Sequence, residues 1–301
     1  MTRNLKLQLN RFRMRNTFIK CLVERARVDQ SIVLIIGDLG FNVVEPFQNE
    51  FPNRFFNAGI SEQAMASMAA GMASEGYKVF IYSIANFPTF RCAEQIRNDI
   101  CYHNLDVTVV SVGGGLAYGN LGYSHHAIQD YGLMRLFPEI SIISPGDPNE
   151  VKKCMEFIYK DNNPKYLRLR KAGEENISNY SNKLVPGKWQ PILIKNSKKI
   201  LLTTGYGLKI AKDLITQEKY KDFSIYSCPI WGQKYSHVQK TNLSCFETVI
   251  TVEDHLNAGG FGSWLQENSS DYRDKIESIY IKNSVIGMVG EEGYLLNENI
   301  S

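Results

Sequence analysis

The chain has 301 residues, of which 44% are hydrophobic and 22% are charged. This composition is typical of a globular protein, and a chain of this length usually folds as two domains. The 34 basic and 31 acidic side chains leave a net charge of only +3. Such a balance creates no broad positive field, so we expect neither nucleic acid nor a membrane as a partner. Any basic site must be local and suited to a small anionic substrate.

The six cysteines are scattered, without a C-x-x-C pair or the spacing of a metal site. Isolated thiols in a chain of this size favour a reducing compartment, and we expect a cytoplasmic protein that holds no metal itself. The first twenty residues carry six basic side chains and no acidic one. A transit peptide is one explanation, but no long apolar region or small-residue cleavage pattern follows. We prefer a solvated arm that leads into the first helix.

Short apolar runs alternate with helix-like segments through the first half of the chain. The runs expected to be strands cover residues 31–37 (SIVLIIG), 79–83, 107–112 and 141–144. The expected helices cover residues 17–28, 62–75, 91–102, 127–137 and 149–159. This alternation predicts a mostly parallel sheet covered by helices on both faces.

A polar stretch with Gly173, Pro186, Gly187 and Pro191 interrupts this pattern, and we expect a linker over residues 176–190. A second α/β series follows, with strands expected at 200–204, 223–228 and 248–252 and helices at 208–217 and 262–268. The predicted fold class is therefore α/β, with two domains over residues 1–175 and 191–301. Each domain is expected to be a mostly parallel sheet flanked by helices.

Residues 55–76 (FFNAGISEQAMASMAAGMASEG) predict a helix that begins near Ser61, with Glu62 in its first turn. Its many small residues permit close approach by another helix. From spacing alone, Glu62 could be a surface acid that complements the helix dipole. The stretch resembles the G-I-S/A-E-Q segment of the pyrimidine-binding domain of transketolases, especially those split over two chains. In that family the glutamate shares a proton with the aminopyrimidine ring of thiamine diphosphate. The resemblance therefore implies that Glu62 is catalytic, and its Ala- and Met-rich surroundings suit an acid that holds a proton near neutral pH.

Two further segments resemble the cofactor site of this family. Residues 35–42 (IIGDLGFN) are similar to its strand and following acid, and residues 85–104 are similar to the aromatic turn on which the pyrimidine stacks. The resemblance assigns to the cofactor Phe87, Phe90, Ile84, Asp38 and Arg91. Ile84 stands where another phenylalanine is common. Without the flanking motifs, Phe87 and Phe90 would be interpreted as ordinary core residues.

Residues 119–150 resemble the family's glycine-rich loop and its T-H-Q or T-H-H element. His125 matches the histidine that contacts the substrate, so we expect it to be catalytic. The resemblance assigns to the substrate Arg15, Asn42, His126, Arg170 and Lys171. In the second half, residues 251–265 resemble an E-x-H turn, for which we expect a structural role of Glu253 and His255 at an interface.

Two positions depart from the family pattern in the part that contacts sugar hydroxyls or phosphate. Gly113 replaces a histidine that follows the preceding strand, and Leu121 replaces an acid in the loop. The cofactor residues are retained while these two substrate contacts are changed. We therefore expect a sugar or sugar phosphate other than the usual pentose phosphates.

The G-D-G motif with which this family binds the diphosphate and its metal does not occur in the chain. The resemblance implies a separate partner subunit that carries the diphosphate-binding domain and holds Mg²⁺, and we expect a heterotetramer. The predicted activity is transfer of a two-carbon ketol unit from a ketose to an aldehyde acceptor. The first alternative is the beta subunit of a thiamine-dependent 2-oxo acid dehydrogenase, which also has I-S-E at the glutamate. The E-Q-I-R run at 94–97 and the His125 element favour transketolase. The second alternative, a non-catalytic partner, is disfavoured by the retention of Glu62, Phe87 and Phe90.

Overall fold

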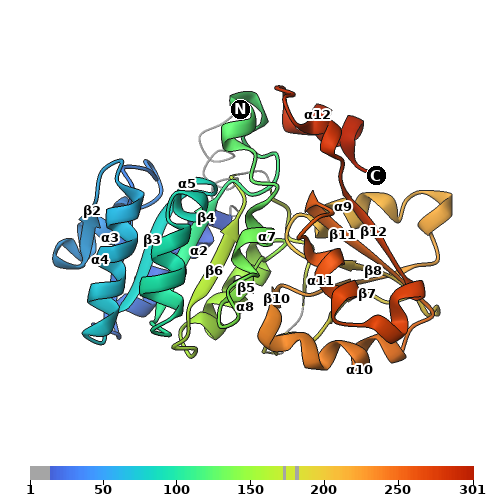
Figure 1. Cartoon of the computed structure of the whole chain (residues 1–301), viewed down its shortest axis with the longest axis horizontal. Helices are drawn as coiled ribbons and strands as arrows, with labels where there is room; N and C mark the ends of the chain where they lie inside the picture. Colours follow the sequence, from blue (N-terminus) through green and yellow to red (C-terminus); the bar gives the residue numbers. More distant parts are fainter. Residues whose placement is uncertain (1–13, 172–173, 180–182) are drawn as a thin grey trace.

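The computed structural model describes residues 14–171, 174–179 and 183–301. Most of the predicted basic arm, residues 1–13, lies outside these ranges. The described chain forms two sheets that lie side by side, each flanked by helices (Figure 1). Within the described ranges, no helix is long and apolar enough to cross a membrane.

The first sheet has seven strands in the order β10-β5-β6-β4-β3-β1-β2. Their bounds are β1 (Ile32–Ile36), β2 (Phe55–Asn57), β3 (Lys78–Ile84), β4 (Val107–Val112), β5 (Ser141–Ile143), β6 (Lys165–Leu169) and β10 (Ile230–Trp231). All neighbouring pairs from β5 to β2 are parallel, and only β10 runs antiparallel to its neighbour β5. β1 is apolar and buried along its whole length, as expected for a strand covered on both faces. The predicted parallel sheet is confirmed.

Helices cover both faces of this sheet. Side chains of β1 alternate between two cores: Ile32 and Leu34 pack with one set of helices, and Val33 and Ile35 with the other. The first set is α2 (Met14–Ala26), α3 (Glu45–Glu50) and α8 (Pro148–Ile158). The second set is α4 (Glu62–Ser74), η2 (Ile96–Cys101) and α7 (Asp130–Met134). Between β3 and η2 lie two short helical turns, α5 (Phe87–Phe90) and α6 (Ala93–Gln95). The helix expected over residues 91–102 is formed by α6 and η2.

The alanines of α4 face the chain's own core. Ala66, Ala69 and Ala73 are buried in the same cluster as Val33 and Ile35 of the sheet. The close approach that these small residues permit is therefore an approach to the chain's own sheet and to η2.

The second sheet has five strands in the order β12-β11-β8-β9-β7. Their bounds are β7 (Gln190–Leu193), β8 (Lys199–Thr203), β9 (Ser224–Ser227), β11 (Thr248–Leu256) and β12 (Ile276–Ile281). Only β7 is antiparallel to its neighbour. The helices that follow in this half are α9 (Gly207–Leu214), α10 (Gln239–Ser244), α11 (Phe261–Glu267) and α12 (Glu292–Asn299). Because β10 lies between β9 and β11 in the chain but belongs to the first sheet, the two halves are interleaved.

A buried arginine joins the two halves. The Arg168 guanidinium on β6 donates to the carboxylate of Asp130 on α7 (2.8 Å) and to that of Asp254 on β11 (2.7 Å). It also donates to the carbonyl oxygen of Ala127 (2.7 Å). All three charged side chains are almost completely buried. Buried charges are tolerated when they are paired and hydrogen-bonded in this way.

A second buried ionic group lies near the amino-terminal edge of the first sheet. The Asp106 carboxylate accepts from Lys165 (2.7 Å) and from Lys78, through one oxygen each. The Lys165 ammonium also donates to the carbonyl oxygen of Asp161 (2.7 Å). Burial lowers the pKa of Lys165 to about 8, although Asp106 opposes the shift. Asp106 therefore pairs with both buried cations, and the charge of Asp161 adds to the compensation of Lys165.

We expect Asp106→Asn to lower the free energy of unfolding by roughly 3–5 kcal/mol at pH 7, because it leaves buried charges uncompensated. Unfolded Lys165 would keep its proton to about pH 10.4, whereas the folded protein releases it near pH 8 or below. Raising the pH from 7 to 9.5 should therefore shrink the deficit relative to wild type. Denaturant unfolding at both pH values measures this. Asp271→Asn removes an exposed pair with Lys240 and should leave the midpoint nearly unchanged. Equal effects of the two substitutions on the free energy of unfolding would contradict the role of Asp106 in compensating buried charge.

Candidate active site

The predicted site residues gather at the carboxyl-terminal edge of the first sheet, where ligands bind in open parallel sheets. Asp38 follows β1, Glu62 follows β2, Phe87 follows β3 and Lys171 follows β6. His125 lies in the loop that follows β4. Segments far apart in the sequence thus present these side chains together.

Glu62 lies in the first turn of α4, and only 3% of its side chain is exposed. A cavity of about 500 Å³ opens beside it, lined by Ile60, Ser61, Glu62, Gln63, Ala64 and Arg91. The Arg91 guanidinium donates to the Glu62 carboxylate at 3.0 Å. Behind the carboxylate, a Cβ added at Gly37 would lie 3.6 Å from Cγ of Glu62, so the backbone of β1 approaches closely. Burial and a single cationic partner therefore define the surroundings of this acid.

A row of ring and cation contacts leads away from Glu62. The Arg91 guanidinium lies 4.2 Å from the centroid of the Phe87 ring. Phe87 meets His125 edge-on, with ring centroids 5.2 Å apart and an interplanar angle of 72°. His125 meets Tyr118 at 6.1 Å, and the Lys171 ammonium lies 4.7 Å from the Tyr118 centroid. The row therefore connects the buried acid at one end with an exposed cation at the other.

The two adjacent histidines have different surroundings. Nδ1 of His125 lies 3.0 Å from Oγ of Ser124. Burial lowers the pKa of His125, and the charges of His126 and Arg91 lower it further, so its imidazole is neutral at neutral pH. His126 is buried, with Nε2 lying 3.3 Å from the carbonyl oxygen of Gly119. His125 thus faces the row, whereas His126 supports the loop.

Asn86 fixes the aromatic turn against the histidine loop. Its side-chain amide donates to the carbonyl oxygens of Ser124 (3.1 Å) and His126 (3.0 Å). It therefore holds Phe87 and His125 in register. Sequence reasoning missed this residue, since an asparagine before an apolar turn carries no signal of a contact with a loop so far along the chain.

Other predicted cofactor residues lie at the edge of this arrangement. Asp38 is exposed and is hydrogen-bonded twice to the Asn57 side chain. The backbone amide of Asp38 donates to Oδ1 of Asn57 (3.1 Å), and Nδ2 of Asn57 donates to the Asp38 carboxylate (2.9 Å). Ile84 is partly buried at the end of β3. Phe90 is exposed and makes no ring contact with another described residue. Of the assigned aromatic residues, Phe87 alone joins the row in this part of the chain.

The predicted substrate residues are divided between two environments. Lys171 joins the row, and the charge of Arg15 acts on the Tyr118 phenol. Arg170 is instead buried, where its guanidinium donates to the carboxylate of Glu292 and lies 3.4 Å from the centroid of the Tyr206 ring. The structure therefore places Arg170 in an intrachain ion pair rather than in the row.

Asn42 lies away from the row. It is exposed, and with Asn16, Val43 and Pro46 it lines a separate depression beside α2. The structure does not bring it to Glu62 or His125.

The E-x-H turn has the structural role expected for it. The Glu253 carboxylate accepts from the amides of Phe261 (2.7 Å) and Gly262 (2.8 Å) at the start of α11. Burial raises the pKa of Glu253 to about 8. The His255 ring is buried and stacks on Tyr131, with centroids 5.0 Å apart. Glu253 therefore fixes the start of α11 within the second half, and His255 contacts the first half through Tyr131.

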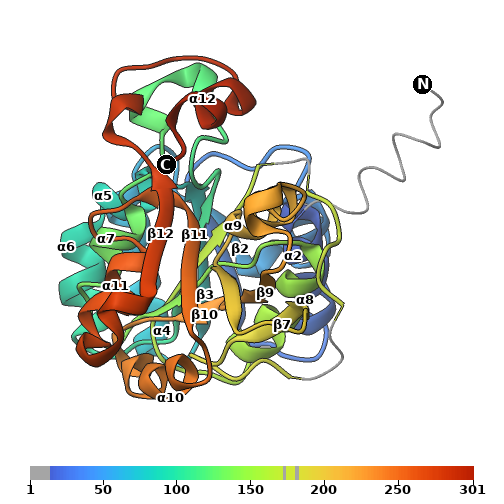
Figure 2. The ribbon, with the colours of Figure 1, turned by 90° about the vertical axis from the view of Figure 1, so that its right-hand side faces the viewer.

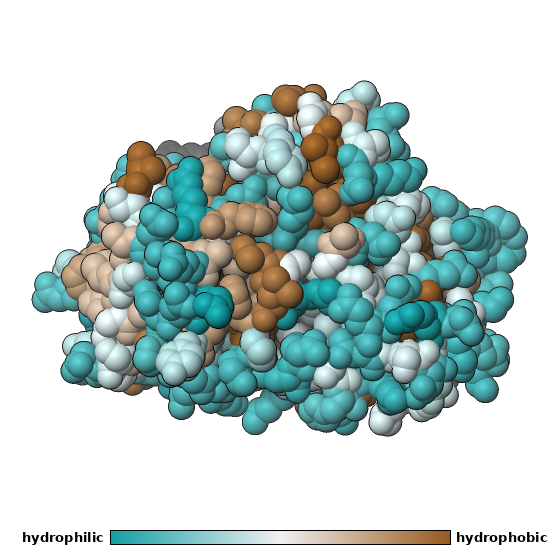
Figure 3. All heavy atoms as spheres, viewed as in Figure 1, coloured by the Kyte–Doolittle hydropathy of each residue, from teal (hydrophilic) through white to brown (hydrophobic). Residues whose placement is uncertain are grey.

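The glycine-rich loop packs against the C-terminal segment. A Cβ added at Gly119 would lie 2.5 Å from the carbonyl oxygen of Gly290 and 2.7 Å from Leu295 of α12. Figure 2 shows α12 and this loop together at one end of the molecule. Apolar side chains gather there on the surface (Figure 3), and the exposed ones include Leu121, Tyr123, Val289 and Tyr294. This exposed apolar surface lies beside the row.

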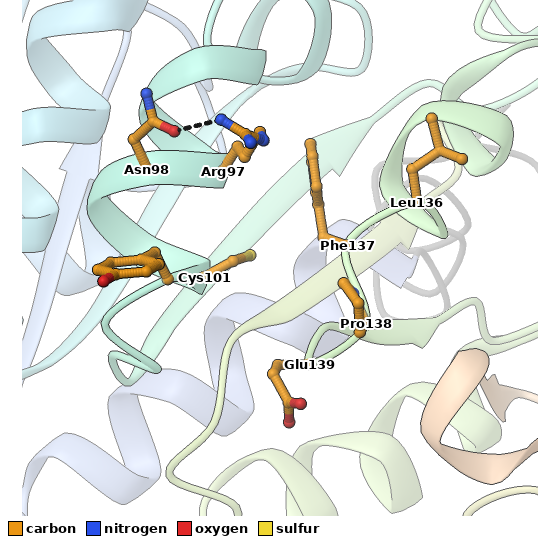
Figure 4. Close-up of a pocket in the computed structure, with 8 residues that line it drawn as sticks. Arg97, Asn98, Cys101, Leu136, Phe137, Pro138 and Glu139 are labelled. Carbon is orange, nitrogen blue, oxygen red and sulfur yellow. Dashed lines mark hydrogen bonds between the residues drawn. The ribbon is translucent and has the colours of Figure 1, made fainter.

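A groove of about 630 Å³ lies elsewhere, between η2 and the segment after α7 (Figure 4). Arg97, Asn98, Cys101 and Tyr102 form one wall, and residues 136–139 form the other. It contains none of the residues assigned to cofactor or substrate. The chemistry of the side chains therefore places the candidate site at Glu62.

The residues around Glu62 fit the pyrimidine end of the expected cofactor. A buried carboxylate, an open cavity beside it and the nearby ring of Phe87 suit a planar ring with a basic nitrogen. In the described ranges, no group of three histidine, cysteine, aspartate or glutamate residues could hold a metal ion.

Comparison with known proteins agrees with this geometry. Residues 10–173 match the family model described as transketolase, pyrimidine binding domain. The chain is 30% identical over 266 residues to one of the subunits named for apulose-4-phosphate transketolase in Phocaeicola vulgatus, covering 87% of this chain and 85% of that protein. It is also 29% identical over 294 residues to a 1-deoxy-D-xylulose-5-phosphate synthase of Clostridium perfringens, covering 92% of this chain but only 46% of that protein.

A solved structure titled split gene transketolase, inactive beta4 tetramer has the same fold. It superposes with a TM-score of 0.80 at 25% identity, covering 95% of this chain and 92% of that chain. The similarity thus extends over both halves of the chain, including the part after residue 173.

We expect Gly113→Ala to lower the free energy of unfolding by about 1–3 kcal/mol. Gly113 has φ +88°, and a Cβ there would lie 2.0 Å from the Tyr118 ring. Gly71→Ala in α4 is the matched control, because a Cβ at Gly71 meets open space and should add roughly 0.5–1 kcal/mol. Denaturant unfolding of both variants measures the difference. The double variant Gly113→Ala/Tyr118→Ala should recover part of the loss, and a strictly additive result would disprove the steric explanation.

Proposed function

Because this chain belongs to the transketolase family, we propose that it supplies the pyrimidine-activating half of a two-chain transketolase. The enzyme would transfer a two-carbon ketol unit from a ketose to an aldehyde acceptor. The observation that carries the proposal is the buried Glu62 carboxylate beside an open cavity, in one row with Phe87 and His125. The 2-oxo acid dehydrogenase alternative is disfavoured, because this chain is similar to a transketolase subunit over most of the length of both chains.

Thiamine diphosphate, when bound, would supply the electron sink that this reaction needs. Glu62 would hold a proton at the pyrimidine ring nitrogen, since its carboxylate faces the cavity. Phe87 would bind the face of the ring. His125, neutral at neutral pH, can donate or accept a hydrogen bond at a substrate oxygen.

Arg91 would have to release Glu62 for the pyrimidine to reach the carboxylate. Its side chain is 49% exposed, so the guanidinium can leave without crossing the core. In the free chain it compensates the buried carboxylate, and after release it stays beside Phe87 at the mouth of the cavity.

We further propose that a separate subunit carries the diphosphate-binding domain and Mg²⁺, in a cytoplasmic heterotetramer. The relatives support this, since one is named as a single subunit of its transketolase and a solved relative as the product of a split gene. The exposed apolar side chains of the glycine-rich loop and C-terminal segment would be covered by that second chain. All six cysteines are free thiols, in keeping with a reducing compartment.

The proposed substrate is a sugar phosphate other than the usual pentose phosphates. Lys171 and Arg15 supply positive charge at the end of the row distant from Glu62. The relative from Phocaeicola vulgatus is named for apulose 4-phosphate, which makes that sugar the first to test.

Purified alone, the chain should not bind thiamine diphosphate tightly and should show no turnover, because it offers contacts only to the pyrimidine end. Titration calorimetry with the cofactor and Mg²⁺ measures this directly. Micromolar affinity of the isolated chain would refute the two-chain proposal.

In the complex with its partner, Glu62→Gln should slow hydrogen–deuterium exchange at the thiazolium carbon by about 10²–10⁴-fold. Glutamine keeps the size and a hydrogen bond but cannot ionise, so cofactor affinity should change little. Glu75→Gln, at the exposed end of the same helix, is the matched control and should exchange like wild type. Exchange at the wild-type rate in Glu62→Gln would reduce Glu62 to a structural acid. Loss of cofactor binding would make it an anchor rather than a proton-transfer group.

A further inference from the structure

Tyr118 lies directly over Gly113, the position at which the family resemblance expects a substrate-contacting histidine. A Cβ added at Gly113 would lie 2.0 Å from Cε2 and 2.3 Å from Cδ2 of the Tyr118 ring. The ring therefore occupies the space that a side chain at position 113 would need. The histidine side chain expected at position 113 is absent, and the polar side chain of Tyr118 lies there instead.

The surroundings of Tyr118 combine cations with the catalytic row. The Lys171 ammonium lies 4.7 Å from its ring centroid, and the His125 ring lies 6.1 Å away. Burial raises the pKa of the Tyr118 phenol, and the charge of Arg15 opposes this effect only in part. The phenol is therefore protonated at neutral pH and available as a hydrogen-bond donor.

The hydroxyl of Tyr118 is not used within the described part of the chain. Other tyrosines nearby are engaged: Tyr123 donates to Oε1 of Gln129 at 3.0 Å, and the Tyr131 hydroxyl is bonded to Oγ of Ser144. For Tyr118 no such partner exists among the described residues, and its hydroxyl is not one of the buried polar atoms that lack partners. Among residues 14–171, 174–179 and 183–301 the hydroxyl therefore has no partner, and Tyr118 is only partly buried.

The backbone around Tyr118 is fixed on both sides. Gly115 and Ala127 exchange two backbone hydrogen bonds of 2.9 Å, which close the base of the loop. The amide of Leu121 donates to the carbonyl oxygen of Tyr118 at 2.8 Å. A group held in this way can be placed accurately against a ligand.

We propose that Tyr118 is a specificity-determining residue of the substrate pocket. Its hydroxyl binds an oxygen of the anionic group of a sugar phosphate, between Lys171 and His125. Its ring forms the pocket wall over Gly113, where another sugar would need a polar partner. Lys171 and Arg15 provide positive charge, and the phenol provides a directed, charge-assisted hydrogen bond. This inference rests on the proposed function and specifies how that site selects its substrate.

The test compares Tyr118→Phe with Tyr77→Phe, an exposed tyrosine between α4 and β3, each in the complex with the partner subunit and thiamine diphosphate. Apulose 4-phosphate and xylulose 5-phosphate are titrated by calorimetry and then used as donors in turnover assays. Tyr118→Phe keeps the ring and removes only the hydroxyl. It should raise Kd and KM for the bound sugar about 10- to 100-fold, the effect of losing one hydrogen bond to a charged group. The value of kcat should change only a few-fold, and Tyr77→Phe should behave like wild type.

Hydrogen–deuterium exchange at the thiazolium carbon separates this inference from the proposed function. Normal exchange in Tyr118→Phe together with unchanged Kd and KM would overturn the role of Tyr118 and leave the proposed function intact. Absent exchange in the wild-type complex would overturn the proposed function, while calorimetry would still decide the role of Tyr118. A wild-type complex that binds neither sugar phosphate would also overturn the role of Tyr118. Equal melting temperatures of the variants exclude a loss of fold as the cause.

Discussion

The Arg168 ion cluster is the interaction on which the arrangement of the two halves depends. Its guanidinium is removed from water and needs both Asp130 and Asp254, which come from different halves of the chain. Removal of Arg168 would leave two buried carboxylates without the cation that they share. Asp254 also touches the glycine-rich loop, since a Cβ at Gly115 would lie 2.2 Å from its carboxylate. The loop that carries Tyr118 and His125 therefore takes its position from this buried charge.

The candidate site separates charge along a line of neutral rings. At one end a single cation, Arg91, compensates the buried Glu62 carboxylate, and at the other end Lys171 faces solvent beside Tyr118. Phe87 and His125 lie between and carry no net charge at neutral pH. Because Arg91 compensates Glu62, the net positive charge lies at the Lys171 end, and an anionic group would be attracted there. The electrostatics alone thus orient a phosphorylated substrate with its phosphate away from the acid.

The sequence was sufficient to predict a helix or strand where its local pattern and its burial agree. The apolar run at β1 and the Glu-initiated helix α4 were predicted close to their observed bounds. The strands β2, β7 and β10 have two to four residues each and are too short to show a periodic pattern. The roles of single side chains were harder to predict, because their partners are distant in the chain. Arg170 looked like a free cation beside Lys171, but Glu292 from the C-terminal helix neutralises it. Tyr118 carried no motif, and only its place over Gly113 gives it a role.

The two-residue strand β10 limits how such a chain can be divided or recombined. Ile230 and Trp231 pair with β5 and so close one edge of the first sheet with residues from the other half. Trp231 is fully buried, with the rings of Tyr131, Phe261 and Trp264 each 5.2 Å away. A gene fragment that ended at the linker would leave β5 as a bare edge and open this aromatic cluster to water, which invites aggregation. The two halves therefore depend on each other for a complete first sheet. A chimaera that exchanges one half needs residues 230–231 matched to the sheet that they complete.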